Sequence, residues 1–134
     1  MSGSFFDTNV LLYLASNDPA KADRVEQLIE AGGSISVQEL NEIAHVARRK
    51  ISLSWTEVHT FLSAIRALLA VQPVTIAVHD TALALAERHG FSIYHALIVA
   101  AALHAGCDTL WSEDMQHGML IESTLRIVNP FRGA

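Results

Sequence analysis

The amino-acid sequence predicts an α/β fold, a three-layer α/β/α sandwich built on a mainly parallel sheet. Two observations carry this prediction: short strand-like segments alternate with longer helix-like ones, and a helix separates most successive strands. Such helices return the chain to the same end of the sheet, so the strands run parallel and both faces are covered. With 134 residues, 51% of them hydrophobic and 17% charged, the chain is expected to form one domain, residues 1–134.

Each expected element has a local reason in the sequence. The strand candidates are short apolar segments, and they are expected at 4–7, 34–37, 73–78, 108–112 and 124–129. The helix candidates are longer apolar-periodic or alanine-rich segments, and they are expected at 8–16, 19–32, 37–50, 54–70, 79–90 and 92–106. The order of these elements gives the alternation on which the fold class depends.

Several helix ends carry recognisable start or stop residues. Pro19 suits the first helical position, and Ser54 and Ser92 are residues that commonly cap a helix N-terminus. Gly90 is suited to the left-handed conformation that ends many helices. The pair His79–Asp80 is interpreted as capping the start of its own helix.

Composition excludes several classes of protein. The net charge of −5 argues against non-specific coating of nucleic acid, because phosphate contacts need clustered Lys and Arg. The one basic cluster, 48–50, is expected to be a solvated helix end. No apolar run approaches the ~18–20 residues of a membrane span, and the N-terminus has no signal-peptide pattern. The lone Cys107 allows no intrachain disulfide, so a reducing, cytoplasmic location is expected.

Two aspartates fall where a parallel sheet concentrates its chemistry. Asp7 stands at the end of the first expected strand, and Asp114 lies just past the end of the strand at 108–112. Ligands bind such sheets at the carboxyl ends of the strands. Aspartate is also a common helix N-cap. From the residues alone, two alternatives remain: the two aspartates form a functional site, or each only caps a helix.

Three segments together resemble one known family. FFDTNVLLYL, ISVQELNEIAHVARRK and SIYHALIVAAALHAGCDTLWSED are similar, in order and spacing, to the PIN-domain family and to its VapC-type toxin ribonucleases. The resemblance covers essentially the whole chain. It implies a PIN-like fold and a cluster of acids that holds Mg²⁺ or Mn²⁺ and hydrolyses single-stranded RNA.

The resemblance also implies roles for individual residues. Asp7, Glu42 and Asp114 match acidic positions of the family and are expected to anchor the metal and carry catalysis. Carboxylates are the ligands that such hard ions prefer. Asn9 and Ser112 are expected to orient those carboxylates through hydrogen bonds. The substrate-binding residues are not identified.

The choice of Glu42 depends on the resemblance alone. On a helical wheel Glu42 lies about 150° from the apolar face of its helix, so periodicity predicts a solvated surface acid. Its neighbour Glu39 competes for the same role. The Asn41–Glu42 context favours Glu42.

His95 stands where the family pattern usually has an aspartate. In one hypothesis it is a neutral metal ligand, which would favour Mn²⁺ or Zn²⁺ over Mg²⁺. In a second the site is weakened or inactive, and the protein only binds its partners. In a third His95 contacts the substrate as an acid or phosphate ligand, and a histidine that only packs is the remaining alternative.

The remaining expectations concern partners and competing functions. The resemblance implies an RNA substrate, a VapB-like antitoxin partner and a homodimer, and no membrane association is expected.

An aspartyl-phosphate phosphatase is disfavoured because Asn9 occupies the position where such enzymes need a second Asp. His45, three residues after Glu42, is expected on the helix surface, and His104 and His117 match no metal-ligand spacing. Trp55 and Trp111 are expected in the core or an interface. The competing function is an inactive PIN-like protein that binds an antitoxin.

Overall fold

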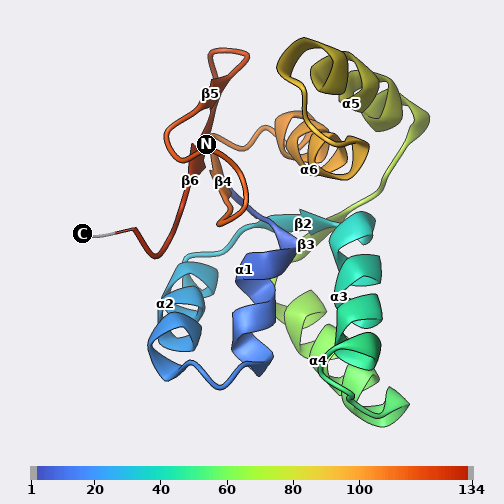
Figure 1. Cartoon of the computed structure of the whole chain (residues 1–134), viewed down its shortest axis with the longest axis vertical. Helices are drawn as coiled ribbons and strands as arrows, with labels where there is room; N and C mark the ends of the chain where they lie inside the picture. Colours follow the sequence, from blue (N-terminus) through green and yellow to red (C-terminus); the bar gives the residue numbers. More distant parts are fainter. Residues whose placement is uncertain (1–2, 133–134) are drawn as a thin grey trace.

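The computed structural model describes residues 3–132, which form helices packed on both sides of a central sheet (Figure 1). The strands are β1 Ser4–Phe6, β2 Ser34–Ser36, β3 Ala70–Gln72, β4 Thr109–Trp111, β5 Leu120–Ile121 and β6 Leu125–Val128. The helices are α1 Thr8–Leu12, α2 Pro19–Glu30, α3 Val37–Arg49, α4 Trp55–Leu68, α5 Ile76–His89 and α6 Ile93–His104, and a 3₁₀ turn, η1, spans Tyr13–Ala15. The three-layer α/β/α prediction is confirmed.

The sheet has the strand order β3-β2-β1-β4-β6-β5. All neighbouring strands pair in parallel except β5 and β6, which pair antiparallel. From β1 the chain builds outward through β2 and β3, and then returns to place β4 on the other side of β1. The order therefore reverses between β1 and β4, which is the position where open α/β sheets bind ligands.

Alternate residues of the central strands supply two separate cores. Phe5 and Leu110 point to the face covered by α5 and α6, and Phe6 points to the face covered by α1 to α4 (Figure 1). This division follows from the two-residue period of a strand. Burial on both faces explains why the centre of each of these two strands is apolar: Phe5 and Phe6 of β1 and Leu110 of β4 are fully buried.

The expected strand at 73–78 is wrong. The strand of that region is β3, three residues earlier, and Pro73 follows its end. Proline has no N–H to donate to a sheet, and Thr75 begins α5 by accepting a hydrogen bond from the N–H of Val78. The interpretation of His79–Asp80 as the cap is therefore wrong as well, because both residues lie inside α5.

Other local signals agree with the structure. Pro19 is the first residue of α2, Gly90 ends α5 with a left-handed φ of 74°, and Ser92 caps α6. Ser54 forms a reciprocal capping box with Glu57 at the start of α4. The two-residue strand β5 was not expected, since it is too short to produce an alternating pattern. Within residues 3–132, no helix is long and apolar enough to cross a membrane.

Candidate active site

The carboxyl ends of β1 and β4 bring the two predicted aspartates together. β1 and β4 are adjacent and parallel, with Phe6 opposite Trp111, so the residues that follow them share one edge. Asp7 follows β1, and Asp114 lies in the loop after β4. The first turn of α6 adds His95 to the same place.

Asp7, His95 and Asp114 form a cluster with the geometry of a metal site. One possible ligand atom from each residue lies within 4.8 Å of the other two. Asp7 is buried at 3% exposure, His95 is half-buried and Asp114 is exposed. The cluster therefore has a closed side at the sheet and an open side from which a substrate could approach.

Asp7 is fixed through both carboxylate oxygens. The Thr8 backbone N–H donates to Oδ1 at 2.7 Å, and the Ser112 hydroxyl donates to Oδ2 at 2.8 Å. Asp7 is also the N-cap of α1, so the cap interpretation is confirmed, and the same carboxylate lies in the three-residue cluster. Burial raises the pKa of Asp7 to about 6, although the Ser112 hydroxyl, His95 and the Thr8 N–H all act to lower it.

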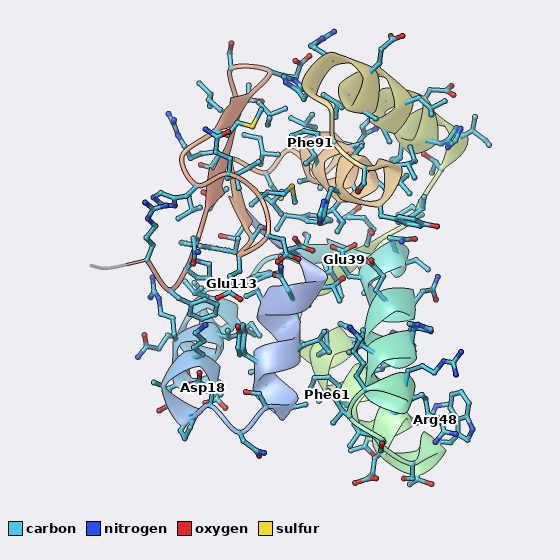
Figure 2. All side chains as sticks on the ribbon, in the orientation of Figure 1. Asp18, Glu39, Arg48, Phe61, Phe91 and Glu113 are labelled. Carbon is cyan, nitrogen blue, oxygen red and sulfur yellow. The ribbon has the colours of Figure 1, made fainter. Side chains whose placement is uncertain are left out.

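The loop after β4 holds Asp114 at the cluster and directs its neighbour Glu113 elsewhere. Ser112 Oγ accepts a hydrogen bond from the Asp114 N–H at 3.2 Å while donating to Asp7, which ties the two acids to one hydroxyl. Glu113 instead accepts from the Tyr13 hydroxyl at 2.6 Å and from Lys21 Nζ at 2.9 Å (labelled in Figure 2). Glu113 is thus engaged outside the cluster.

Glu42 lies beside the cluster but is not one of its three members. Its Oε1 accepts a hydrogen bond from the Thr8 hydroxyl at 2.9 Å, and the side chain is half-buried. The fully solvated position that periodicity suggested is therefore wrong. Thr8 links Glu42 to Asp7, because its hydroxyl donates to the first and its N–H to the second.

Glu39, which competes with Glu42 for a role in the site, is fully buried on the same helix. It is 0% exposed, and Oε1 accepts a hydrogen bond from the Ser36 hydroxyl. Within residues 3–132, Oε2 has no hydrogen-bond partner. Figure 2 shows Glu39 near the start of α1. Burial, with a smaller contribution from the charge of nearby Asp7, raises its pKa to about 8.

A sequence signal for Glu39 existed. Glu39, Ile43 and Ala47 recur every four residues and are the buried residues of α3. A glutamate on the apolar face of a helix is unusual enough to indicate a site, because burying a carboxyl without full hydrogen bonding is costly.

Asn9 does not make the hydrogen bonds that were expected of it. Its side-chain nitrogen and oxygen are both buried, and neither has a hydrogen-bond partner in the described part of the chain. The expected contact between Ser112 and a site carboxylate, in contrast, is present at Asp7.

Comparisons with known proteins agree with this architecture. A sequence model described as "PIN domain" matches residues 4–117, whereas curated proteins give no significant sequence match. A toxin–antitoxin complex from Klebsiella pneumoniae superposes with a TM-score of 0.73 at 19% identity, covering 96% of this chain and 98% of the other.

Two further solved structures show the same fold. DNA-bound VapBC from Salmonella typhimurium gives a TM-score of 0.71 at 19% identity, covering 95% of this chain and 97% of the other. Mycobacterium tuberculosis VapC20, a toxin that cleaves the sarcin–ricin loop, gives a TM-score of 0.67 at 20% identity, covering 83% of this chain and 91% of the other. Since the PIN-domain match runs through β1, β4 and the acidic edge between them, this chain belongs to the PIN-domain family.

Proposed function

We propose that this protein is a VapC-like toxin, a metal-dependent endoribonuclease that hydrolyses phosphodiester bonds of RNA at the Asp7–His95–Asp114 cluster. The observation that carries the proposal is this cluster of three ligand atoms within 4.8 Å, placed at the switch point of the sheet. The PIN-domain match and the toxin neighbours support the same activity.

The residues present fit a divalent ion. Two carboxylates and an imidazole are suitable donors, and the buried Glu39 Oε2, which lacks a hydrogen bond within residues 3–132, provides a further oxygen nearby. An imidazole in place of a carboxylate favours Mn²⁺ over Mg²⁺, since Mg²⁺ prefers oxygen ligands. When bound, the ion would activate a water molecule and neutralise charge on the phosphate oxygens.

The protein's own residues position this chemistry. Thr8 and Ser112 hold both oxygens of Asp7, so the carboxylate has one orientation before any ion or substrate arrives. We assign Glu42 a positioning role through Thr8 in place of the ligand role expected from the sequence. Glu39, like Glu42, lies outside the three-residue cluster. We propose it as the further ligand because its carboxyl is buried, is influenced by the charge of Asp7 and keeps one oxygen free among the described residues.

His95 is assigned as a metal ligand. Its ring lies with the two aspartates in the cluster, and α6 begins just before it, with Ser92 accepting a hydrogen bond from the His95 N–H at 3.2 Å. The geometry supports this hypothesis over a packing role, because packing alone does not require a ring nitrogen to face two carboxylates.

The test compares RNA cleavage by the parent protein, Asp7→Asn and His95→Asp in Mn²⁺ and in Mg²⁺. We expect the parent to cleave single-stranded RNA better in Mn²⁺, His95→Asp to shift the preference toward Mg²⁺, and Asp7→Asn to lose activity. Mn²⁺ affinity measured by calorimetry gives a second readout that does not depend on finding the right RNA. A parent protein that neither binds Mn²⁺ nor cleaves would contradict the proposal.

A second candidate function is an inactive PIN-domain protein that only binds its antitoxin. The presence of His95 in place of the family's aspartate favours it. Cleavage by His95→Asp but not by the parent, in either metal, would support this candidate.

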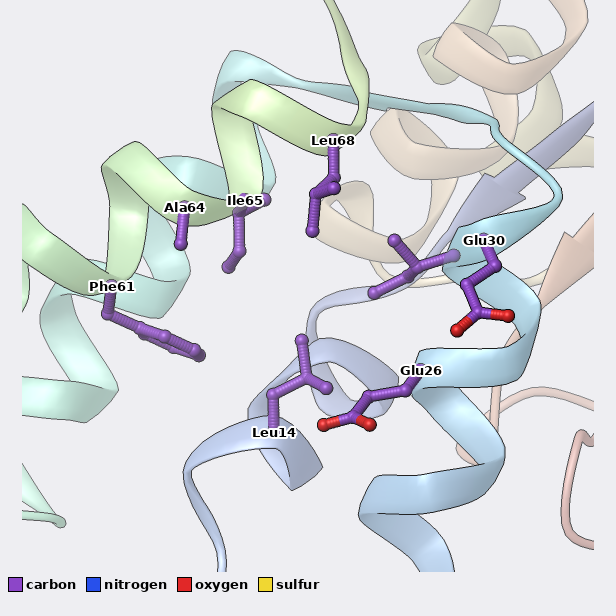
Figure 3. Close-up of a pocket in the computed structure, with 8 residues that line it drawn as sticks. Leu14, Glu26, Glu30, Phe61, Ala64, Ile65 and Leu68 are labelled. Carbon is purple, nitrogen blue, oxygen red and sulfur yellow. The ribbon is translucent and has the colours of Figure 1, made fainter.

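We also propose a VapB-like antitoxin as partner, supported by an apolar groove between α2 and α4 (Figure 3). The groove has a volume of about 390 Å³, its floor is apolar, with Leu14, Phe61 and Leu68, and Glu26 and Glu30 line one side. This surface suits a helical segment that carries apolar and basic residues. A Leu68→Lys variant is expected to weaken the complex with a co-purified antitoxin, without loss of metal binding.

We also propose that the protein is cytoplasmic and forms a homodimer. The exposed apolar side chains Ile76, Leu83 and Tyr94 lie on α5 and α6, and Ile76 is 77% exposed. Exposed apolar side chains of this kind often mark subunit contacts. Light scattering of the parent and of Ile76→Glu tests the dimer.

A further inference from the structure

A second surface lies along the exposed side of α3, beginning next to the candidate active site. One hollow of about 450 Å³ is lined by Gln38, Asn41, Glu42, His45, Val46 and Tyr94, and Tyr94 adjoins His95 in the sequence. A second hollow of about 590 Å³ is lined by Ala44, His45, Arg48, Arg49 and Trp55. His45 lines both, so the two hollows adjoin at this residue.

The far end of this surface presents an aromatic ring held in place by an arginine. The Arg48 guanidinium carbon lies 4.5 Å from the centre of the Trp55 ring, and Arg48 Nη1 donates to the Leu53 carbonyl at 2.9 Å. Trp55 is 61% exposed, so of the two expected places, core or interface, the core is wrong and an interface stays a prediction. The Ser54 capping box fixes the start of α4, where Trp55 is the first residue.

Neither arginine of this surface has its charge neutralised by an ion pair in the described part of the chain. Within residues 3–132 the ion pairs are Lys21–Glu113 and Arg88–Glu122, and neither involves Arg48 or Arg49. Both arginines are exposed in the last turn of α3. In a chain with only 9 Lys and Arg against 14 Asp and Glu, two adjacent unneutralised arginines favour an anionic ligand at this place.

The spacing of Glu42 and Arg49 along α3 places the arginines within reach of an RNA strand bound at the cluster. Arg49 follows Glu42 by seven residues in α3, which corresponds to about 10 Å along the helix axis. Single-stranded nucleic acid is bound by this combination of a basic track for the phosphates and an exposed aromatic ring for base stacking. An acidic peptide would use the arginines but would gain little from the ring.

We propose that the α3 surface, with Arg48, Arg49 and Trp55, binds the single-stranded RNA that extends from the scissile bond. Arg49 and Arg48 contact phosphates, and one base stacks on Trp55. This inference rests on the proposed ribonuclease function, since it names the substrate-binding residues of the same site.

The test measures binding of the full-length protein to a fluorescein-labelled single-stranded oligoribonucleotide, without metal and with EDTA, across a range of KCl concentrations. Arg49→Gln is compared with Arg66→Gln, which removes the same charge from an exposed position in the last turn of α4. We expect Arg49→Gln alone to weaken binding and to reduce the slope of log K against log salt by about 0.7, the contribution of one phosphate contact. Equal slopes for both variants would overturn the proposal.

Trp55 is tested by a pair of substitutions. Trp55→Ser is expected to lose about 10-fold in RNA affinity, whereas Trp55→Phe keeps an aromatic face and most of the affinity. Thermal unfolding of both variants controls for the stability of α4. Polyglutamate serves as the competing anion. The proposal fails if Trp55→Ser binds RNA with the affinity of the parent protein and polyglutamate displaces RNA equally well from both. The surface would then serve an acidic protein partner.

These outcomes separate the two proposals. Because binding is measured without metal, loss of RNA affinity in the α3 variants supports the surface even if the protein cleaves nothing. Conversely, Asp7-dependent cleavage with unchanged RNA affinity in Arg49→Gln and Trp55→Ser overturns the surface and leaves the nuclease proposal intact.

Discussion

At the scale of single residues, the buried acids dominate the behaviour of the metal-free protein. Burial raises the pKa of Asp7 to about 6 and that of Glu39 to about 8. A carboxyl whose pKa is raised on folding favours the folded state at low pH, and this stabilisation is lost as the pH rises through the folded pKa. The site therefore destabilises the free protein at neutral pH, as is common for strained functional groups.

Asp7→Asn is expected to stabilise the metal-free protein. For the parent, the Asp7 contribution is fully present below about pH 4 and is lost as the pH rises to 6 and above. The variant should gain up to about 3 kcal/mol in free energy of unfolding above pH 6 and little at pH 4. Urea unfolding in EDTA at pH 4 and 8 measures this, with Asp80→Asn, an exposed position of α5, as control. A loss of stability at pH 8 would show that the hydrogen bonds of Asp7 outweigh its burial.

Glu39→Gln and Glu42→Gln decide which glutamate serves the metal. We expect Glu39→Gln to raise the Kd for Mn²⁺ by about 10-fold or more, because Glu39 keeps Oε2 free among the described residues and is buried beside Asp7. Glu42→Gln should have a smaller effect, since Glu42 acts through Thr8. Calorimetric titration at pH 8 makes the comparison. The reverse order of effects would restore Glu42 as the ligand.

At the scale of elements, one glycine controls how β2 approaches β1. Gly33 has φ of 152°, and a Cβ there would lie 2.7 Å from the Phe6 ring and 2.8 Å from the Ser4 carbonyl oxygen. Both atoms belong to β1, the strand that carries Asp7 at its end. A change at Gly33 therefore reaches the site through the sheet.

Gly33→Ala is expected to destabilise the protein by at least about 2 kcal/mol, since the new methyl group clashes with backbone and with a packed ring. Gly32→Ala is the matched control: its φ of 87° is also positive, but a Cβ there meets nothing within 4 Å. That variant should lose only about 1 kcal/mol, from backbone strain alone. Chemical unfolding of both at one pH measures the difference, and equal losses would refute the steric explanation.

At the scale of the whole molecule, metal binding and folding are coupled. An ion that binds only the folded state stabilises it by about 3 kcal/mol when present at 100 times its Kd. Because protons compete for Asp7 and Glu39, the stabilisation should be larger at pH 8 than at pH 5.

The measurement is the change in Tm on adding Mn²⁺ at the two pH values. We expect a rise that is greater at pH 8 in the parent and that is absent from Asp7→Asn at both. A rise of equal size in Asp7→Asn would mean that Mn²⁺ binds elsewhere on the protein.

Much of the architecture could be predicted from the sequence, because local signals agree with the final fold. Pro19, Ser54, Gly90 and Ser92 each mark a helix end where the structure has one. These residues act through their own backbone geometry and hydrogen bonds, and no distant contact is needed for their effect. The strand at 73–78 failed because its apolar side chains mimic a strand, whereas Pro73 and Thr75 favour a helix start.

Three features follow from residues that are neighbours in the chain: the parallel α/β order, the placement of Asp7 and Asp114 at strand ends, and the position of His95 at the start of a helix. Other features arise only when the helices pack. Glu39 is buried near Asp7 while Glu42 accepts a hydrogen bond from Thr8, and Trp55 is exposed against Arg48. The physical reason is that side-chain partners depend on how α1, α3 and α4 pack together. A periodic pattern within one helix can indicate which face is buried, as it does for Glu39, but not which side chains that face meets.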